Sequence, residues 1–146
     1  MANWYGQTRT NYFKVKDEER YQELYGRLMG EEAVEDFTVK KSDGEYWHAF
    51  GSYSDICFYE RSEDGTIDYD NDQVDMYTFY KEISKILQDD SVFVITCTGA
   101  EKLRYLTGYC AVVFPDGTIV EETLDGFAIK TVKEKYGDNY ALHLDY

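Results

Sequence analysis

Apolar residues recur at helical spacing in two segments of the chain. The first stripe begins four residues after Asp17, a good N-cap residue, and predicts a helix that ends at Gly30. The second stripe begins at Met76 and predicts the clearest helix, with an apolar face suited to covering a sheet. A third helix is predicted over residues 124–136, ending at Gly137. The two stripes consist of Tyr21, Leu24, Tyr25 and Leu28, and of Met76, Phe79, Tyr80, Ile83, Ile86 and Leu87.

β-prone segments lie between these helices. Single strands are predicted at residues 8–16, 55–59, 91–97 and 140–146. Segment 91–97 begins with apolar residues on both alternating faces, which is typical of a central strand covered on both sides. Two hairpins are predicted, one with a type I′ turn at Asp43-Gly44 and one with a turn at residues 115–117.

The predicted order of elements is β-α-β-β-β-α-β-β-β-α-β. This order indicates one α+β domain over residues 1–146, with a mainly antiparallel sheet and two or three helices packed on one face. A split β-α-β arrangement, as in ferredoxin-like folds, is the topology that fits it, with additional elements.

The chain is strongly acidic, with 29 Asp and Glu residues against 15 Lys and Arg residues and a formal net charge of −14. The summed field of these charges repels nucleic-acid phosphates and anionic lipids, and it speeds encounter with basic partners. We therefore expect neither direct nucleic-acid binding nor membrane binding. The N-terminal residues do not resemble a signal peptide, and the three cysteines lack disulfide or zinc spacing. These features predict a cytoplasmic protein with reduced thiols.

Motifs for catalysis and cofactor binding are absent from the sequence. It has two histidines, no nucleophile elbow, no pair of cysteines or histidines at zinc-ligand spacing, and no Rossmann or P-loop glycine pattern. We assign no catalytic residue, metal or cofactor. One alternative stays open, in which a small enzyme or ligand-binding domain has its pocket near His48, Cys57 and Glu101.

Seven carboxylates are concentrated in residues 60–75, and we consider them the candidate partner-binding residues. Residues 68–79 begin like an EF-hand loop but have Gln73 and Phe79 where that loop needs Gly and Glu. One interpretation is a solvated loop in which Asp72 or Asp75 caps the second helix. The other is an extended row in which every second residue projects at about 6.7 Å intervals and substitutes for a nucleic-acid backbone. The seven are Glu60, Glu63, Asp64, Asp68, Asp70, Asp72 and Asp75.

Aromatic residues are dense in residues 46–59. Because side chains alternate along a strand, only one face of each strand can join the core. If no helix covers the other face, its aromatic side chains form an exposed patch, suited to a partner or to a homodimer.

Three short segments carry a resemblance to known proteins: Asn3-Trp4, residues 9–13 (RTNYF) and residues 47–53 (WHAFGSY). They resemble small acidic proteins of bacterial mobile elements and phages. Some of those proteins antagonise restriction or CRISPR nucleases by occupying nucleic-acid grooves. The net charge and the carboxylates of residues 60–75 predict a non-enzymatic protein that engages a basic, nucleic-acid-binding protein. The resemblance implies that it is an inhibitor of anti-CRISPR or anti-restriction character, and it assigns no residue a role.

Overall fold

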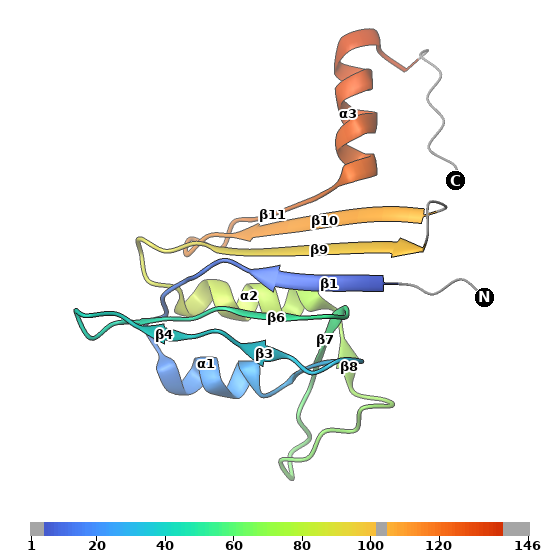
Figure 1. The fold of residues 1–146 in the computed structure, drawn as a ribbon. Helices are drawn as coiled ribbons and strands as arrows, with labels where there is room; N and C mark the ends of the chain where they lie inside the picture. Colours follow the sequence, from blue (N-terminus) through green and yellow to red (C-terminus); the bar gives the residue numbers. More distant parts are fainter. Residues whose placement is uncertain (1–4, 102–104, 139–146) are drawn as a thin grey trace.

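The computed structural model describes residues 5–101 and 105–138. Helices and strands follow one another along these residues as drawn in Figure 1. The first half contains β1 (Tyr5–Thr10), α1 (Glu18–Tyr25), β2 (Leu28–Gly30), β3 (Glu35–Asp36), β4 (Val39–Lys40), β5 (Tyr46–Trp47), β6 (Phe50–Ser52) and β7 (Ile56–Tyr59). The second half contains β8 (Gln73–Val74), α2 (Met76–Ile86), β9 (Phe93–Glu101), β10 (Tyr105–Val113), β11 (Ile119–Thr123) and α3 (Leu124–Tyr136).

The main sheet has six strands in the order β11-β10-β9-β1-β6-β3, and every neighbouring pair is antiparallel. Consequently β1 and β3 run in the same direction on either side of β6, and α1 connects them. In the same way β6 and β9 run in the same direction on either side of β1, and α2 connects them. These two interlocked split β-α-β units give the order β9-β1-β6-β3, which is the ferredoxin-like arrangement. The predicted α+β class and topology are confirmed.

Additional elements extend this framework. The hairpin β4-β5 is inserted between β3 and β6, and a separate three-stranded sheet has the order β2-β7-β8. At the other edge, β10 and β11 lengthen the main sheet beyond β9. The predicted hairpins therefore form, as does the single strand β7. The strand predicted at residues 140–146 lies outside the described residues.

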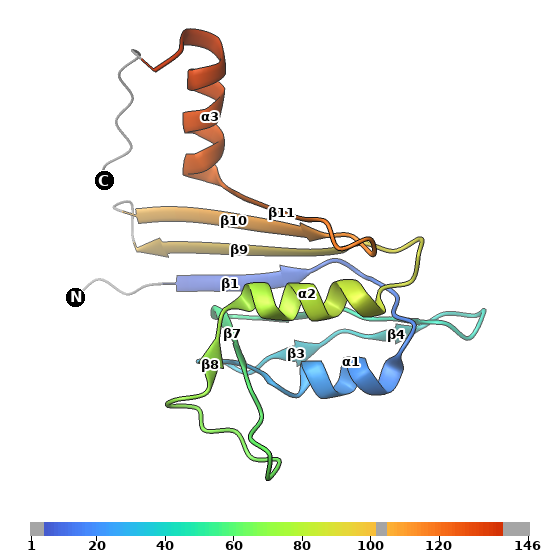
Figure 2. The same ribbon diagram turned by 180° about the vertical axis from the view of Figure 1, so that it is seen from behind.

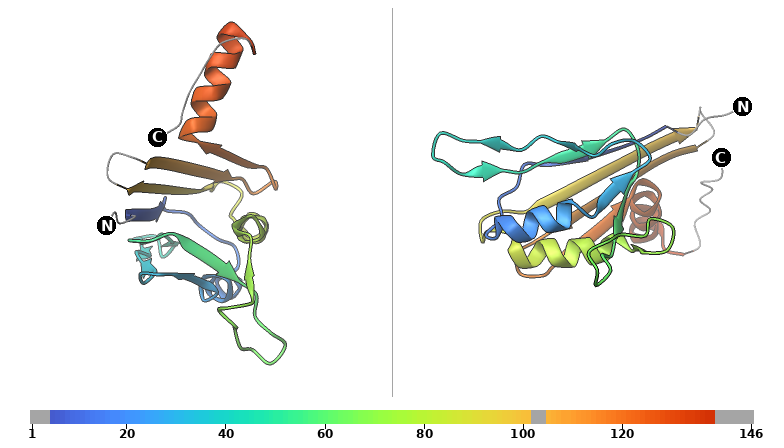
Figure 3. Two further views of the ribbon diagram at one scale, coloured as in Figure 1. Left: turned by 90° about the vertical axis from the view of Figure 1, so that its right-hand side faces the viewer. Right: turned by 90° about the horizontal axis from the view of Figure 1, so that it is seen from below.

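The core lies between the main sheet and two helices. α1 and α2 lie side by side on one face of the sheet, and its other face carries no helix (Figures 2 and 3). Phe13, Phe50, Phe79 and Phe93 are fully buried and meet edge to face, with Phe13 and Phe93 centroids 5.0 Å apart. Such pairs add about 0.5–1.5 kcal/mol beyond their burial. The described part of the chain thus has one aromatic core, between the two helices and the sheet.

The face of the sheet without a helix corrects one prediction, made for residues 91–97, which include the start of β9. Phe93 and Ile95 are buried beneath the helices, but Thr96 and Thr98 are exposed on the opposite side. β9 is therefore a central strand covered on one face only. The apolar start of the segment had suggested two covered faces, but Val92 is 36% exposed and precedes the strand.

The first part of the chain also differs from its prediction. The predicted strand over residues 8–16 is β1, which begins earlier and ends at Thr10. α1 begins after the predicted cap Asp17, but it ends at Tyr25 rather than near Gly30. Leu28–Gly30 instead forms β2 and pairs with β7. Gly30 allows this close approach, since a Cβ there would lie 2.5 Å from Oγ of Ser54 and 2.7 Å from the carbonyl oxygen of Asp55.

Three Asp-Gly turns share one local structure. In each, the glycine N–H donates to the carbonyl three residues earlier, the glycine has a positive φ of 86–94°, and the Asp carboxylate accepts the N–H two residues after it. This is a three-residue loop with a bulge, so the predicted type I′ turn at Asp43-Gly44 is wrong in type. The glycines are Gly44, Gly65 and Gly117, each preceded by Asp.

α3 forms as predicted but does not pack on the sheet. It rises from the β11 edge, away from α1 and α2 (Figure 1), and none of its residues is buried. Its first residue, Leu124, lies over Gly108 of β10, where a Cβ would be 2.6 Å from Leu124 Cδ1. Thus two helices cover the sheet and the third does not. No helix in the described part of the chain is long and apolar enough to cross a membrane.

Candidate functional site: an acidic arm and an open sheet face

Residues 60–75 form an acidic arm that leaves β7, extends away from the body of the protein, and returns through β8 to α2 (Figures 1 and 2). The two sides of the arm meet at its base, where the Glu60 N–H donates to the carbonyl of Asp72 at 2.9 Å. At its end, Asp75 caps α2 by accepting the Tyr77 N–H at 2.8 Å. The predicted capping role of Asp75 is confirmed.

Aspartates within the arm hold its turns. Asp64 accepts hydrogen bonds from the N–H and hydroxyl of Thr66, at 3.0 and 2.7 Å. Asp68 accepts from the Asp70 N–H at 3.0 Å, and Asp72 accepts from the Asp68 N–H at 2.9 Å. The arm therefore has a defined conformation that its own carboxylates stabilise.

Of the two interpretations of this segment, the extended row, in which Asp68, Asp70 and Asp72 would project from one side, is wrong. The Asn71 and Asp72 N–H groups both donate to the carbonyl of Asp68, at 3.2 and 2.8 Å, so the chain turns at this point. A short polar side chain that bonds to its own backbone favours a turn over an extended strand. The three carboxylates consequently do not form a regular row with a strand repeat.

The charges of the arm are not neutralised by cations among the described residues. None of its seven carboxylates forms an ion pair with a described residue, whereas α1 and α2 carry pairs such as Arg20–Glu82 at 3.1 Å. Glu60, Glu63 and Asp70 accept no side-chain hydrogen bond within the described structure. Arg61, the one cation in the arm, donates to the carbonyl of Gly65 at 2.8 Å. The arm is therefore a local concentration of negative charge.

Hydrogen bonding keeps part of this charge present in acid. The amide of Asn71 and the N–H of Asp70 lower the pKa of Asp68, and the hydroxyl and N–H of Thr66 lower the pKa of Asp64. Donors that bond to the ionised form favour it. Both carboxylates stay ionised to lower pH than an ordinary aspartate.

A hollow of about 340 Å³ lies where the end of the arm meets the sheet. Asp55, Asp75 and Glu121 line it, and no Lys or Arg does. The Tyr109 hydroxyl donates to Oε1 of Glu121 at 2.6 Å and lies 3.1 Å from the Tyr80 hydroxyl. Burial raises the pKa of Tyr80 to about 12 and also raises that of Tyr109, so both phenols stay protonated. The hollow thus joins carboxylates to neutral hydroxyls.

The alternative site predicted near His48, Cys57 and Glu101 is not assembled. His48 is buried, and its Nε2 lies 2.7 Å from Glu18 Oε2. Cys57 belongs to the three-stranded sheet, and burial raises the pKa of its thiol, so it lacks the thiolate character of a nucleophile. Glu101 ends β9. These residues line none of the four pockets described for this structure.

The cysteines form no disulfide in the described structure, and the side chains that could bind a metal ion are not grouped there. Cys57, Cys97 and Cys110 are free and partly exposed. Within residues 5–101 and 105–138, no three side chains of His, Cys, Asp or Glu are grouped so that they could hold a metal ion.

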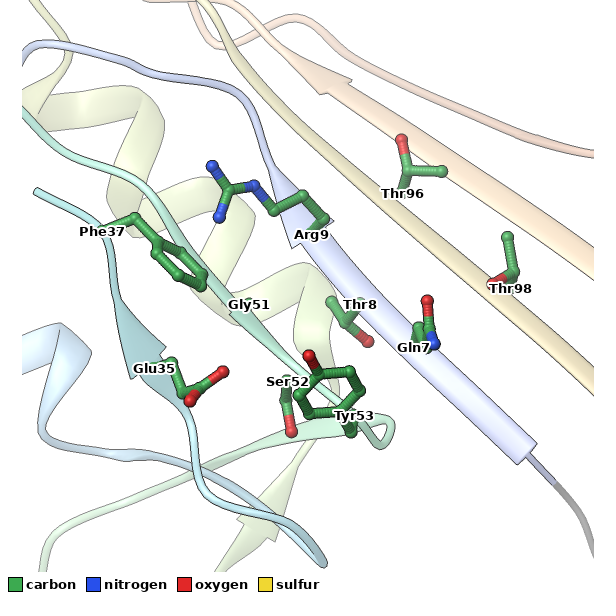
Figure 4. A pocket seen from close by; sticks show the side chains of 10 residues that line it. All are labelled: Gln7, Thr8, Arg9, Glu35, Phe37, Gly51, Ser52, Tyr53, Thr96 and Thr98. Carbon is green, nitrogen blue, oxygen red and sulfur yellow. The ribbon is translucent and has the colours of Figure 1, made fainter.

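The uncovered side of the main sheet, here called the open face, carries exposed aromatic side chains. Tyr5 and Tyr53 are 70% and 69% exposed, and Phe37 is 37% exposed. The open face also contains a pocket of about 350 Å³ (Figure 4). Sequence reasoning indicated a possible aromatic patch but not this pocket. Its lining residues come from β1, β3, β6, β9 and their flanks: Gln7, Thr8, Arg9, Glu35, Phe37, Gly51, Ser52, Tyr53, Thr96 and Thr98.

Comparison with models of protein families, with curated proteins and with solved structures gave no significant match to this chain.

Proposed function

We propose that this chain is a non-enzymatic binding protein whose acidic arm engages a basic surface of a protein that binds nucleic acid. The observation that carries the proposal is the absence of any ion pair between the arm's seven carboxylates and the described residues. Unneutralised charge that extends from the body is available to cations of a partner. Complementary charge of this kind increases association rate and specificity.

The hollow beside the arm supports the same interpretation. Asp75 belongs both to the arm and to the hollow, so the negative surface continues from the arm to the sheet. A guanidinium or ammonium group that entered the hollow would meet carboxylates and phenol oxygens and no fixed cation. An arginine or lysine side chain of the partner is the ligand that fits this chemistry.

The partner class follows from the overall charge. With a net charge of −14, the chain repels nucleic acid but is attracted to the Lys- and Arg-rich grooves that bind it. We therefore propose that it competes with nucleic acid for such a groove, as an anti-restriction or anti-CRISPR inhibitor in the cytoplasm would. In this mechanism the turned arm competes with nucleic acid for the groove through its concentrated charge. It does not present a regular row of charges that imitates a nucleic-acid backbone.

A labelled nona-arginine peptide tests whether the arm receives cations. Affinity should fall by more than about tenfold when NaCl is raised from about 50 to about 500 mM, because salt screens exposed charges. The triple variant Glu60→Gln, Glu63→Gln, Asp70→Asn removes three charges without removing a hydrogen bond from the arm. It should bind at least about fivefold more weakly at low salt.

The matched control removes three carboxylates elsewhere, with Glu19→Gln, Asp125→Asn and Glu134→Gln. The control variant has the same net charge as the arm variant. If the arm itself binds the peptide, the control variant should bind nona-arginine more tightly than the arm variant does. Equal affinities for the two triple variants would show that only net charge matters and would overturn the proposal. Binding that is insensitive to salt would overturn it as well.

A further inference from the structure

The pocket on the open face depends on a strand position that has no side chain. Gly51 of β6 pairs with Arg9 of β1 on one side and with Glu35 of β3 on the other. A Cβ at Gly51 would lie 2.8 Å from the carbonyl oxygen of Thr8, so no larger residue fits without a shift of the backbone. Arg9 Cδ and Phe37 Cε2 would each lie 3.4 Å from that Cβ, so these two side chains cover Gly51, and the pocket beside them is lined by one cation, Arg9, and one anion, Glu35 (Figure 4).

The cation is fixed in place but its charge is not paired. The Arg9 guanidinium lies over the Phe37 ring, 4.0 Å from its centroid, and its Nη2 lies 3.5 Å from the Tyr12 hydroxyl. No described carboxylate forms an ion pair with Arg9, although the chain carries a large excess of carboxylates. A guanidinium stacked on a ring keeps its N–H edge available for bidentate binding of a carboxylate.

The anion is also unpaired. The Glu35 carboxylate accepts no hydrogen bond and forms no ion pair within residues 5–101 and 105–138. Its Cα is separated from that of Arg9 by two strand spacings, which is about 10 Å. Arg9 and Glu35 thus lie on opposite sides of Gly51 in the register of the sheet, and they form no ion pair with each other.

Neutral polar and aromatic groups form the rest of the pocket. Gln7 and Thr98 are paired neighbours on β1 and β9, and both side chains are exposed on the open face. Neither forms a side-chain hydrogen bond with another described residue. Tyr53, which is largely exposed, lines the side near Glu35 (Figure 4). The pocket therefore offers donors, acceptors and an aromatic wall in addition to the two charges.

We infer that this pocket binds a free apolar amino acid, with the ligand's carboxylate on Arg9, its ammonium on Glu35, and its side chain against Tyr53 and Phe37. A ligand with charges of both signs satisfies both unpaired groups. It also carries no net charge, so the field of the −14 chain does not repel it as it would a nucleotide or another polyanion. The volume of about 350 Å³ is at the lower end for small-molecule sites and suits a ligand of this size.

This site is distinct from the acidic arm, so the inference goes beyond the proposed function and either can fail alone. The probes are L-phenylalanine, L-leucine and L-methionine, each titrated into the full chain and followed by backbone amide shifts in NMR. At least one should bind with a Kd below about 10 mM and shift the amides of Gln7, Gly51 and Thr98. Absence of binding by all three at about 10 mM, or shifts confined to other regions, would overturn the inference.

Analogues and variants test the assignment of the two charges. The analogues of L-phenylalanine that retain only one charge are 3-phenylpropionate and phenethylamine, and each should bind at least about tenfold more weakly. Arg9→Gln and Glu35→Gln should each weaken L-phenylalanine binding by a similar factor, while Lys41→Gln and Glu19→Gln, which change exposed charges elsewhere, should not. Equal binding of the zwitterion and 3-phenylpropionate would overturn the role of Glu35. Unchanged binding by Arg9→Gln would overturn the site.

Discussion

His48 Nε2 lies 2.7 Å from Oε2 of Glu18, and this bond ties the start of α1 to the strand segment beside β6. The His48 side chain is 2% exposed, while the Glu18 side chain is 47% exposed. Since a carboxylate can only accept, Nε2 carries the proton, and in the neutral ring Nδ1 accepts from the Thr38 hydroxyl at 3.0 Å. Both ring nitrogens of this buried histidine are therefore satisfied, and the pair is structural.

Glu18→Ala should therefore destabilise the protein, because it leaves the buried Nε2–H of His48 without an acceptor. A buried donor left unsatisfied costs about 1–3 kcal/mol of unfolding free energy. Urea denaturation followed by circular dichroism measures this loss. Glu19→Ala is the matched control, as Glu19 is exposed on the same first turn of α1, and it should change stability by less than about 0.5 kcal/mol. Equal losses for the two variants would contradict the role given to His48.

Gly30→Ala should be among the most damaging glycine substitutions. The added Cβ would lie 2.5 Å from Ser54 Oγ and 2.7 Å from the carbonyl oxygen of Asp55, and the carbonyl cannot rotate away. Overpacking of this kind costs about 1–3 kcal/mol. In Gly26→Ala the φ of −65° suits alanine and the nearest atom is 3.3 Å away, so the change should stay below about 1 kcal/mol. Thermal and urea denaturation of both variants would test this difference.

The fold could be predicted where a local pattern matched the physical requirement. The apolar stripe of α2 predicts a helix, and the Asp-Gly pairs predict the hairpin turns, because in each case a few neighbouring residues determine the local structure. β1 was placed too late because its buried face consists of Gly6, Thr8 and Thr10, which give no hydrophobic alternation. Tyr5, Gln7 and Arg9 occupy its exposed face, so the polarity pattern of this strand carries no sign of burial.

Of the candidate site, only the part that the local amino-acid composition reveals could be predicted from the sequence. The density of carboxylates in residues 60–75 identified the acidic arm, but its turns depend on which backbone groups each Asp binds, and that outcome needs coordinates. Arg9 and Glu35 are far apart in sequence and lie on strands separated by β6. Their common pocket follows from strand order and from Gly51, neither of which a residue pattern specifies.

Asn71→Ala should raise the pKa of Asp68. The Asn71 amide donates to Asp68 Oδ2 at 2.8 Å and is the main cause of the lowered pKa, so its removal moves the pKa back toward the ordinary value of 3.8. Folding lowers the pKa of Asp68, so the ionised carboxylate contributes to the free energy of unfolding. This contribution is fully present at pH values above the pKa of the unfolded chain, and it is lost as the pH falls from there through the pKa of the folded chain. The carboxyl carbon shift of Asp68, followed by NMR between about pH 2 and pH 6, gives the titration midpoint in the unmodified chain and in the variant. An unchanged midpoint for Asp68 would contradict the assigned cause.

Two substitutions at the hydrogen bond between Tyr109 and Glu121 distinguish the effect of the charge of the hollow on binding from its effect on stability. Glu121→Gln keeps a carbonyl oxygen that can accept from Tyr109 but removes one of three carboxylates, so it should weaken nona-arginine binding by about twofold to fivefold with little loss of stability. Tyr109→Phe keeps the carboxylate but removes the donor, so it should cost about 1 kcal/mol of unfolding free energy and leave the affinity nearly unchanged. Titrations at low salt and urea denaturation of both variants provide the two measurements. If Glu121→Gln bound the peptide like the unmodified chain, the hollow would not receive a cation, and the binding surface would be confined to the arm.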